Sequence, residues 1–463
     1  MIVKFLEGNT DFGINPVDSK YKVLSGKNFF VLWSSLGIGL LVISAGSFVS
    51  SSNITEAIIA IIAGSIVGSI LLALAGKIGS DHSVPSIVSM RPAFGLHGSY
   101  LLTVLNIFQL IGWSTFEITI LSKAANIFSN GYVDFYIWSI VFGAVIVLFC
   151  ILGPLKIVKQ WLSKFAVWVV YGSTIVLLIS IILSTSGGVG SEGVIDSNST
   201  VSTTTANAAS AASTSFDFSF FNSLDLVIAM PLSWLPLVAD YNRFAKKSKN
   251  AFYGTFLGFT ITNCLFYIIG FLLGISDIFA ILVAIQTFFY GFFLLVLIVD
   301  EVDNVFANIF SSAMSFKNIH NKINYKYLVI FFTALGVLLA NLIPIQQYEN
   351  FLLIIGALFA PLFAIVLTDY YIIRRGGRRI TIENFYEKTN RVKISSFLAF
   401  VVGSITYFIL SPISGLHVTD LGLSIGSTIP SMAISILVFL VIELLIKKVK
   451  LKNEEYSSDK KIE

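Results

Sequence analysis

Long apolar runs recur along almost the whole of this chain, and they constrain its fold more strongly than any other feature of the sequence. Of the 463 residues 56% are hydrophobic and 12% are charged, whereas an ordinary soluble domain has about 25% charged residues. A helix that crosses the hydrocarbon core of a bilayer needs about 20 mostly apolar residues. Runs of that kind lie at residues 29–50, 56–79, 100–128, 133–153, 162–185, 223–240, 252–275, 289–314, 327–345, 350–374, 395–412 and 426–446.

These runs predict an all-α polytopic membrane protein with 12 transmembrane helices. The lipid bilayer is the expected surrounding of a transmembrane domain over residues 29–446, with an N-terminal tail at 1–28 and a C-terminal tail at 447–463. Residues 186–222 are rich in Ser, Thr, Ala and Gly and lack basic residues. Such a composition buries too little apolar area to fold firmly, so this segment is predicted to be a flexible external loop.

Lysines and arginines lie at or between the ends of the apolar runs on alternate loops, all on the side of the N-terminus, and the one exception is Lys123, inside the third run. By the positive-inside rule this pattern predicts a multi-pass protein of the cell membrane with cytoplasmic N- and C-termini. Topology accounts for the basic loops, so no nucleic-acid partner is expected. Asn53 and Asn198 begin N-x-S/T patterns in predicted outer loops, which fit glycosylation but also arise by chance.

The first predicted span carries Gly37 and Gly39 near its middle. Each glycine weakens a helix interior by up to about 1 kcal/mol relative to alanine. The pair therefore favours a break that would free backbone carbonyls for a cation. Close helix packing through small residues explains the same glycines, and this span alone does not decide between the two.

The sixth predicted span is interrupted by Pro231 and Pro236, with Ser233 and Trp234 between them. Proline removes an amide donor, and such a gap inside a membrane is tolerated where the freed groups line a cavity or find partners. A broken helix here would offer a hydroxyl and a stacking ring to a solute. Interrupted helices at matching positions of two halves indicate a transporter site, and a plain proline kink is the alternative.

In the third predicted span Trp113 and Glu117 are four residues apart, so they share one helical face. A ring to stack on and a carboxylate to accept N–H bonds suit a planar heterocycle. Glu117 could instead pair with Lys123 in the same span, because an unpaired charge in the bilayer is costly.

The eighth predicted span is unusually polar, with Asp300, Glu301, Asp303, Asn304 and Asn308 within nine residues. All of them except Glu301 share a broad face by three- and four-residue spacing. An oxygen-rich face of this kind can hold a hard cation such as sodium or pass a proton. Glu301 is expected to titrate or to pair with another helix, and a purely structural polar network is the alternative.

Four segments, in the same order along the chain, resemble the nucleobase:cation symporter-1 family of cytosine, purine, hydantoin and thiamin-precursor permeases. They are LSGKN (24–28), SVPSIVSMRPAFGLHG (83–98), PLSWLPLVADYNR (231–243) and GALFAPLFAIVLTDYYIIR (356–374). The form of the sixth span is most similar to the branch linked to hydroxymethylpyrimidine and thiamin-related solutes. The resemblance implies two inverted five-helix repeats, a solute between spans 1, 3, 6 and 8, and two extra C-terminal helices.

The resemblance also implies a binding site. Ser233 and Trp234 of the sixth span are added to the residues that the resemblance implies. The expected substrate-binding residues are therefore Trp113, Glu117, Ser233, Trp234, Asn304 and Asn308. The expected cation site, built from carbonyls and side chains, lies near Ser34, Gly37, Val299, Val302 and Asp303.

This chain departs from the family pattern at three places. Glu117 stands where the family has an amide, and Val302 and Asp303 replace its hydroxyl pair, which leaves sodium or proton as the coupling ion. The stacking aromatic expected early in the sixth span is absent, and Trp234 lies a turn later.

The predicted function is a secondary active transporter, a cation symporter that imports a nucleobase or related flat N-heterocycle by alternating access. An amino-acid/cation symporter of the same helical plan is the alternative, and it would need half-helix amides exposed to a solute carboxylate. A receptor that binds without transport would use the same pocket. No enzyme activity and no cofactor beyond the coupling Na⁺ or H⁺ are expected, because the sequence shows no metal-ligand spacing, nucleophile motif or phosphate-binding loop.

Overall fold

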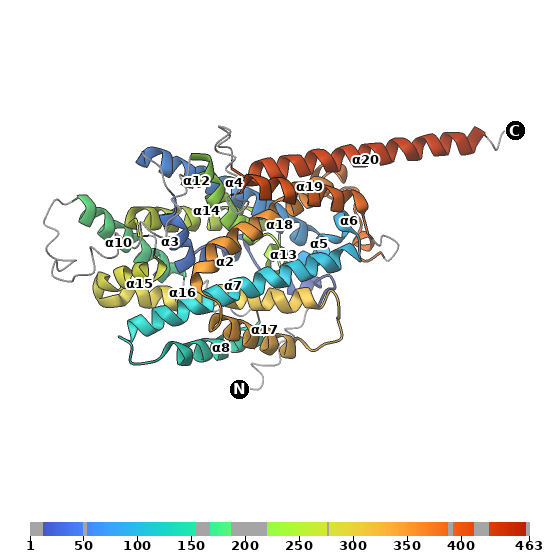
Figure 1. Cartoon of the computed structure of the whole chain (residues 1–463). Coiled ribbons are helices and arrows are strands. Elements are labelled where there is room, and N and C mark those ends of the chain that lie inside the picture. Colours follow the sequence, from blue (N-terminus) through green and yellow to red (C-terminus); the bar gives the residue numbers. More distant parts are fainter. Residues whose placement is uncertain are drawn as a thin grey trace.

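A computed structural model of the chain describes residues 13–49, 53–153, 167–186, 220–275, 277–387, 392–411 and 426–459. Within these ranges the regular structure is helical, and the one β-type pairing is an isolated bridge between Leu24 and Ala245. The long helices lie side by side (Figure 1). Large apolar side chains such as Ile62 on α4 (Ile54–His82) and Ile140 on α8 (Phe135–Leu152) are exposed on its surface, as lipid-facing residues are. The prediction of an all-α polytopic membrane protein is confirmed.

In the described part of the chain, seven helices are long and apolar enough to cross a membrane. They are α4, α8, α7 (Gly98–Phe128), α14 (Ser248–Leu273), α15 (Ile278–Thr287) joined to α16 (Phe292–Phe316), α18 (Tyr348–Thr368) with its flanking turns, and α20 (Thr428–Asp459). Shorter apolar helices are α10 (Val167–Ser186), α12 (Phe220–Ser233), α17 (Tyr325–Ala340) and α19 (Ile394–Leu410). Each predicted apolar run coincides with a helix or a broken helix pair, and the total of 12 spans stays a prediction.

The first span is broken at its glycines, which is one of the two alternatives that the sequence left open. Helix α2 (Gly26–Ser35) begins at a capping box, in which the Ser25 side chain and Asn28 each bond the other's backbone amide. It ends before Gly37, and α3 (Leu40–Ser47) continues at an angle of 62°. The four residues between the two half-helices leave backbone groups without helical partners, so other elements must satisfy them.

The sixth span is broken as well. Helix α12 ends just after Pro231, and a turn that contains Pro236 leads into the short helix α13 (Val238–Asn242). In this turn the amide of Trp234 bonds the carbonyl of Pro231 at 3.2 Å, a three-residue spacing rather than the four of an α-helix. The prolines therefore interrupt the helix instead of merely bending it.

The spans form two bundles. The first bundle contains α2–α3, α4, α12–α13 and α14, and the second bundle contains α7, α8, α16 and α17. Small residues allow the close contacts of the first bundle: a Cβ at Gly64 on α4 would lie only 2.8 Å from Val227 on α12. Gly270 on α14 is likewise pressed against the backbone of Ile43 on α3. Such packing is typical of membrane helices, which gain little from the hydrophobic effect and much from close contact.

Two helical stretches lie outside the predicted apolar runs. Helix α20 continues to Asp459 and projects beyond the other helices in Figure 1, so most of the predicted tail at 447–463 is helical. Helix α15 is an additional element between the seventh and eighth predicted runs. Most of the predicted external loop at 186–222, including Asn198, lies outside the described residues. Asn53 caps α4, its side chain accepting a bond from the amide of Thr55 at 2.9 Å.

Candidate transport site

Side chains from α16 satisfy the backbone groups freed at the break of the first span. The amide of Leu40, the first of α3, donates to Oε2 of Glu301 at 3.0 Å. The carbonyl of Ile38 accepts from Nδ2 of Asn304 at 2.7 Å. Glu301 and Asn304 are buried, and an acidic group at a helix N-terminus is favourable. The eighth span therefore holds the break in the first span, and Glu301 pairs with another helix as one of its expected roles.

Two further carboxyl groups of α16 meet the end of α2. The hydroxyl of Ser35 lies 3.0 Å from Oδ1 of Asp300 and 3.4 Å from Oδ2 of Asp303. The other oxygen of each carboxyl group is buried and, among the described residues, has no hydrogen-bond partner. No described basic side chain forms an ion pair with either group. Two buried acids that lack a basic partner form a place where a cation would be stabilised.

The residues predicted for the cation site converge only in part. Asp303 contacts the first span through Ser35, whereas the hydroxyl of Ser34 accepts a bond from Tyr171 on α10 at 2.7 Å. Gly37 packs against Thr262 of α14. The side chains of the two predicted valines offer no oxygen, and Val299 is 43% exposed while Val302 is buried. Only backbone carbonyls of these valines could bind an ion.

Ser35 and Asp300 contact this site but are not among the residues predicted for the cation. Both stand next to members of that set, Ser35 beside Ser34 and Asp300 three residues before Asp303. A shift of one residue on a helix rotates a side chain by about 100°. The oxygen-rich face was therefore visible in the sequence, but the register of the first span against it was not.

Glu117 on α7 is joined to α16 by a direct side-chain contact. Nδ2 of Asn308 donates to Oε2 of Glu117 at 2.8 Å, and both side chains are buried. Glu117 is also close enough to Glu301 to interact with it electrostatically. The alternative pairing with Lys123 is not formed, because that ammonium group lies over the ring of Phe279 at 5.3 Å. The structure thus brings together two of the predicted substrate-binding residues.

Trp113, one turn before Glu117 on α7, belongs to an aromatic cluster between α7 and α18. Its ring meets those of Tyr348 and Phe351 edge to face, with centroids 5.9 and 5.7 Å apart. Its indole Nε1 is buried and has no hydrogen-bond partner among the described residues. Tyr348 also borders a cavity of about 250 Å³ lined by α3, α15 and the turn before α18. Tyr348 therefore contacts both Trp113 and this cavity.

The side chains of the span-six candidates, Ser233 and Trp234, make contacts of their own. The hydroxyl of Ser233 donates to the carbonyl of Met230 in its own helix at 2.7 Å. Trp234 packs edge to face on Trp33 and Phe259, with centroids 6.2 and 6.4 Å away. None of the hydrogen bonds or ring contacts between described residues joins Ser233 or Trp234 to Trp113 or Glu117. Both side chains are thus used in the packing of the first bundle.

Two amides of α7 that the sequence analysis missed contact the break in the sixth span. Nε2 of Gln109 donates to the carbonyl of Ser233 at 3.1 Å, and Nδ2 of Asn106 lies 3.3 Å from the carbonyl of Pro236. Gln109 precedes Trp113 by four residues and Asn106 by seven. This helical spacing, extended toward the start of α7, could have identified both.

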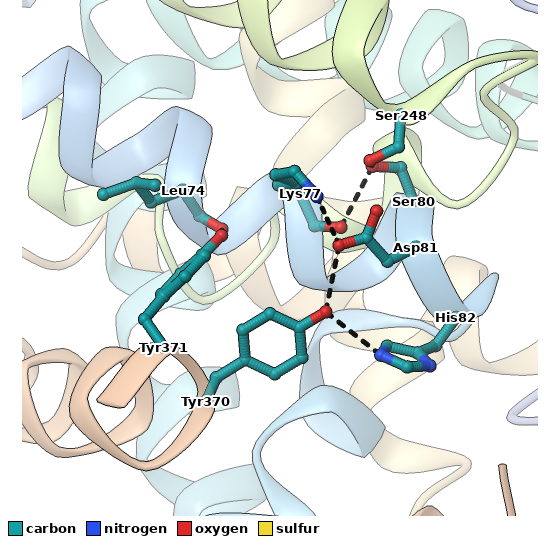
Figure 2. A network of polar contacts seen from close by, with 8 residues as sticks. All are labelled: Leu74, Lys77, Ser80, Asp81, His82, Ser248, Tyr370 and Tyr371. Atoms are coloured by element: carbon teal, nitrogen blue, oxygen red, sulfur yellow. Dashed lines mark hydrogen bonds and ion pairs between the residues drawn. The ribbon is translucent and has the colours of Figure 1, made fainter. Parts of the chain in front are cut away.

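Polar contacts join different helices at the end of the protein where the basic loop residues lie. The hydroxyl of Tyr370 lies between Asp81 and His82 (Figure 2), with hydrogen bonds of 2.9 and 3.1 Å to them. Asp81 also forms an ion pair with Lys77 on α4 at 2.6 Å. Tyr370 belongs to η5 (Asp369–Ile373), a π-helical turn that ends the tenth span. This network therefore ties α4 of the first bundle to the end of the tenth span.

Arg91 strengthens the same end. It is buried in α6 (Arg91–Phe94), where Nη1 donates to the carbonyl of Phe385 at 3.1 Å and Nε to Oδ1 of Asn318 at 3.2 Å. Burial lowers the pKa of the Arg91 guanidinium, and it raises the pKa of the adjacent Tyr386 hydroxyl to about 12. Near neutral pH arginine is still charged and tyrosine is neutral, so the contacts of the Arg91 guanidinium persist over the physiological pH range.

Two broken spans with buried acids and amides gathered at their breaks define a class of protein, the secondary transporters that work by alternating access. The family follows from sequence. The sequence model of the permeases for cytosine/purines, uracil, thiamine and allantoin matches residues 16–424, and the chain belongs to this family. The resemblance drawn from the four sequence segments is confirmed.

Individual relatives agree with this assignment. A putative purine-cytosine permease of Bacillus subtilis, YxlA, is 24% identical over 445 residues, which cover 88% of this chain and 91% of that protein. Mhp1, a nucleobase-cation-symport-1 family transporter, in a closed conformation with bromovinylhydantoin bound, has a TM-score of 0.74 at 18% identity, covering 96% of each chain.

Two further solved structures extend the comparison of folds. The inward-facing conformation of Mhp1 has a TM-score of 0.69 at 19% identity, over 95% of this chain and 93% of that one. A substrate-bound, outward-open Na⁺-coupled sialic acid symporter has a TM-score of 0.62 at 12% identity, over 95% and 92%. At these identities the likeness shows a shared transporter fold.

Proposed function

We propose that this protein imports a nucleobase or a related flat N-heterocycle together with a cation, with both termini in the cytoplasm. The observation that carries the proposal is the buried Asn308–Glu117 pair one turn from Trp113. A flat solute would stack on the indole ring and exchange hydrogen bonds with the acid and amide groups. The hydantoin bound to Mhp1, a transporter of the same fold, is a flat heterocycle too.

In this proposal the cation, sodium or a proton, binds at the break of the first span. Asp300 and Asp303 share the hydroxyl of Ser35 there, and the backbone groups of the break are held by neighbouring side chains of the same helix. A cation on these carboxyl groups would fix the position of α2 against α16. Because α16 also carries Asn308, binding of the cation would favour the arrangement that the solute needs, which is how coupling arises.

Alternating access is supported by the difference between the two ends of the bundle. The basic end is tied together by the Tyr370 network of Figure 2 and by Arg91. The opposite end has the cavity of about 250 Å³ beside Tyr348. Solute would enter from that cavity when the aromatic cluster opens, and it would leave when the contacts of the basic end separate.

The amino-acid alternative is disfavoured by the geometry of the first break. A solute carboxylate would need free amides at a half-helix N-terminus. The amide of Leu40 is already bonded to Glu301. A carboxylate placed there would meet this acidic group.

The proposal is tested by thermal stability of the purified protein in detergent. Nucleobases, hydantoins, hydroxymethylpyrimidine, thiamin and amino acids are added one at a time, with sodium or with potassium, at two pH values. A ligand that binds the native state raises the apparent unfolding temperature. Stabilisation by a flat heterocycle supports the proposal, and stabilisation by amino acids alone refutes it.

A further inference from the structure

The centre of the protein contains more acid than its own basic residues neutralise. Glu117, Asp300, Glu301 and Asp303 are each no more than 2% exposed. In the described ranges none of them forms an ion pair with a lysine, arginine or histidine. An isolated buried carboxylate is costly, so these groups need protons or positive charge supplied by what they bind.

Glu117 is the one acid of this group that stands on the solute side. Asp300 and Asp303 contact Ser35, and Glu301 contacts the amide of Leu40, so all three are bonded to the first span. Glu117 belongs to α7 and lies one turn from Trp113. Its recorded hydrogen bond comes from the amide of Asn308. A solute that stacks on Trp113 would therefore present one edge of its ring to the Glu117 carboxyl group.

A carboxyl group discriminates between ring edges with different donors and acceptors, and an amide does not. An ionised carboxylate only accepts hydrogen bonds, whereas an amide always offers both donors and an acceptor. An amino group next to a ring nitrogen matches the carboxyl group in both of its states. If the acid is protonated, it donates to the ring nitrogen and accepts from the amino group. If the proton has moved to the ring nitrogen, the carboxylate accepts from both N–H groups.

An oxo group next to a ring N–H matches only one of these states. The protonated acid can donate to the carbonyl and accept from the N–H. Once the acid ionises, a carbonyl oxygen faces a carboxylate oxygen and both are acceptors, which is unfavourable in a buried site. Moving the proton to the solute does not relieve this clash, because a ring carbonyl is a weaker base than the ring nitrogen of an amino-azine.

We infer that Glu117 makes this transporter selective for amino-substituted azines, of the aminopyrimidine or aminopurine type, over their oxo counterparts. The inference rests on the proposed function and narrows it. The solute binds as a hydrogen-bonded ion pair, with the proton shared between a carboxyl oxygen of Glu117 and the ring nitrogen beside the amino group. A two-point pair of this kind discriminates by about 10- to 100-fold.

The experiment measures binding of matched pairs that differ only by exchange of amino for oxo, such as cytosine with uracil and adenine with hypoxanthine. The full-length protein is purified in detergent, and affinities are compared for wild type and Glu117→Gln. The substitution keeps the size of the side chain and an acceptor for Asn308. Asp134→Asn is the control, the same chemical change at the exposed cap of α8, where asparagine serves equally well.

Wild type and the control are expected to bind the amino member of a pair roughly 10- to 100-fold more tightly, and Glu117→Gln should bring the ratio close to unity. A preference of wild type for oxo members, or an unchanged ratio in Glu117→Gln, overturns the inference while heterocycle binding still supports the proposed function. Absence of binding by any flat heterocycle overturns the proposed function itself.

If Glu117→Gln does not fold, wild type alone still decides. Replacing both amino hydrogens of a bound amino-azine by methyl groups removes the donor that faces Glu117. Affinity is expected to fall by at least about tenfold, and equal affinity for the dimethylamino derivative contradicts the inference.

Discussion

The two broken spans satisfy their freed backbone groups with different chemistry. At the first break, the amide of Leu40 is bonded by the carboxyl group of Glu301. At the sixth, the carbonyls of Ser233 and Pro236 are contacted by the neutral amides of Gln109 and Asn106. The partners at the first break, the acid of Glu301 and the amide of Asn304, come from α16, whereas those at the sixth break, both neutral, come from α7.

This difference indicates that the two breaks have different roles. The first break lies beside the Asp300–Asp303 pair, so a cation there would be stabilised and would change the position of the half-helices. The sixth break is closed by neutral hydrogen bonds and by the packing of Trp234 on Trp33. We expect substitutions at the first break to change the cation dependence of transport. Substitutions at the sixth break should change mainly the thermal stability of the protein.

The largest effect is expected at the solute-stacking ring. Trp113→Ala should weaken binding of a flat heterocycle by up to about 100-fold, because stacking on an aromatic side chain contributes about 1–3 kcal/mol. The matched change Trp234→Ala removes a ring of the sixth break and should lower thermal stability while leaving solute affinity within about threefold. Ligand binding and unfolding temperature are measured for both. Equal losses of affinity in the two variants would refute the assignment of separate roles.

Removing the acid at the first break should have the next largest effect. Glu301→Ala leaves the amide of Leu40 unpaired, which costs about 1–3 kcal/mol in a buried place, and uptake should fall at least tenfold. Glu301→Gln retains an acceptor for that amide and should fold as stably as wild type. Uptake into proteoliposomes and thermal unfolding are compared. A Glu301→Ala variant that transports normally would show that the bond to Leu40 is dispensable.

Asp303→Asn should change cation dependence without changing solute preference. The substitution removes one of the two carboxyl groups that share Ser35 but keeps the shape of the side chain. The half-saturating cation concentration should change by about tenfold, or the pH of half-maximal uptake by about one unit, since one charge contact is lost. Relative uptake of a panel of heterocycles is the control. An unchanged sodium and pH profile would remove Asp303 from the cation site.

The smallest effect is expected at the sixth break. Gln109→Leu leaves the carbonyl of Ser233 without its partner, and a side-chain hydrogen bond between membrane helices contributes about 1 kcal/mol. The variant should unfold at a slightly lower temperature and keep the cation dependence of wild type. A shift of cation dependence as large as that of Asp303→Asn would show that the two breaks are not distinct in function.

Local sequence patterns predicted much of this architecture. Apolar length gave the positions of the spans, and the glycine and proline pairs gave both breaks. The four-residue spacing placed Trp113 and Glu117 on one face, because a helix repeats about every 3.6 residues. These features depend only on neighbours in sequence, and the family resemblance added the order of the repeats.

Such local patterns could not predict contacts between helices that are distant in sequence. Asn308 bonds Glu117 across 191 positions of sequence, and nothing local to either residue identifies the other as its partner. Trp234 could have faced a solute or the helices of its own bundle, and its packing on Trp33 depends on how those helices approach. Ser35 and not Ser34 meets Asp303, a difference of one helical position that the sequence alone does not determine.

The most direct test is accumulation of a radiolabelled flat heterocycle by proteoliposomes that contain the purified protein. An inward sodium gradient, an inward proton gradient or no gradient is imposed, with the solute at equal concentration on both sides. The account predicts uphill accumulation under one of the two gradients and none without a gradient. Equal, non-concentrating uptake under all three conditions would contradict cation symport through the acidic break of the first span.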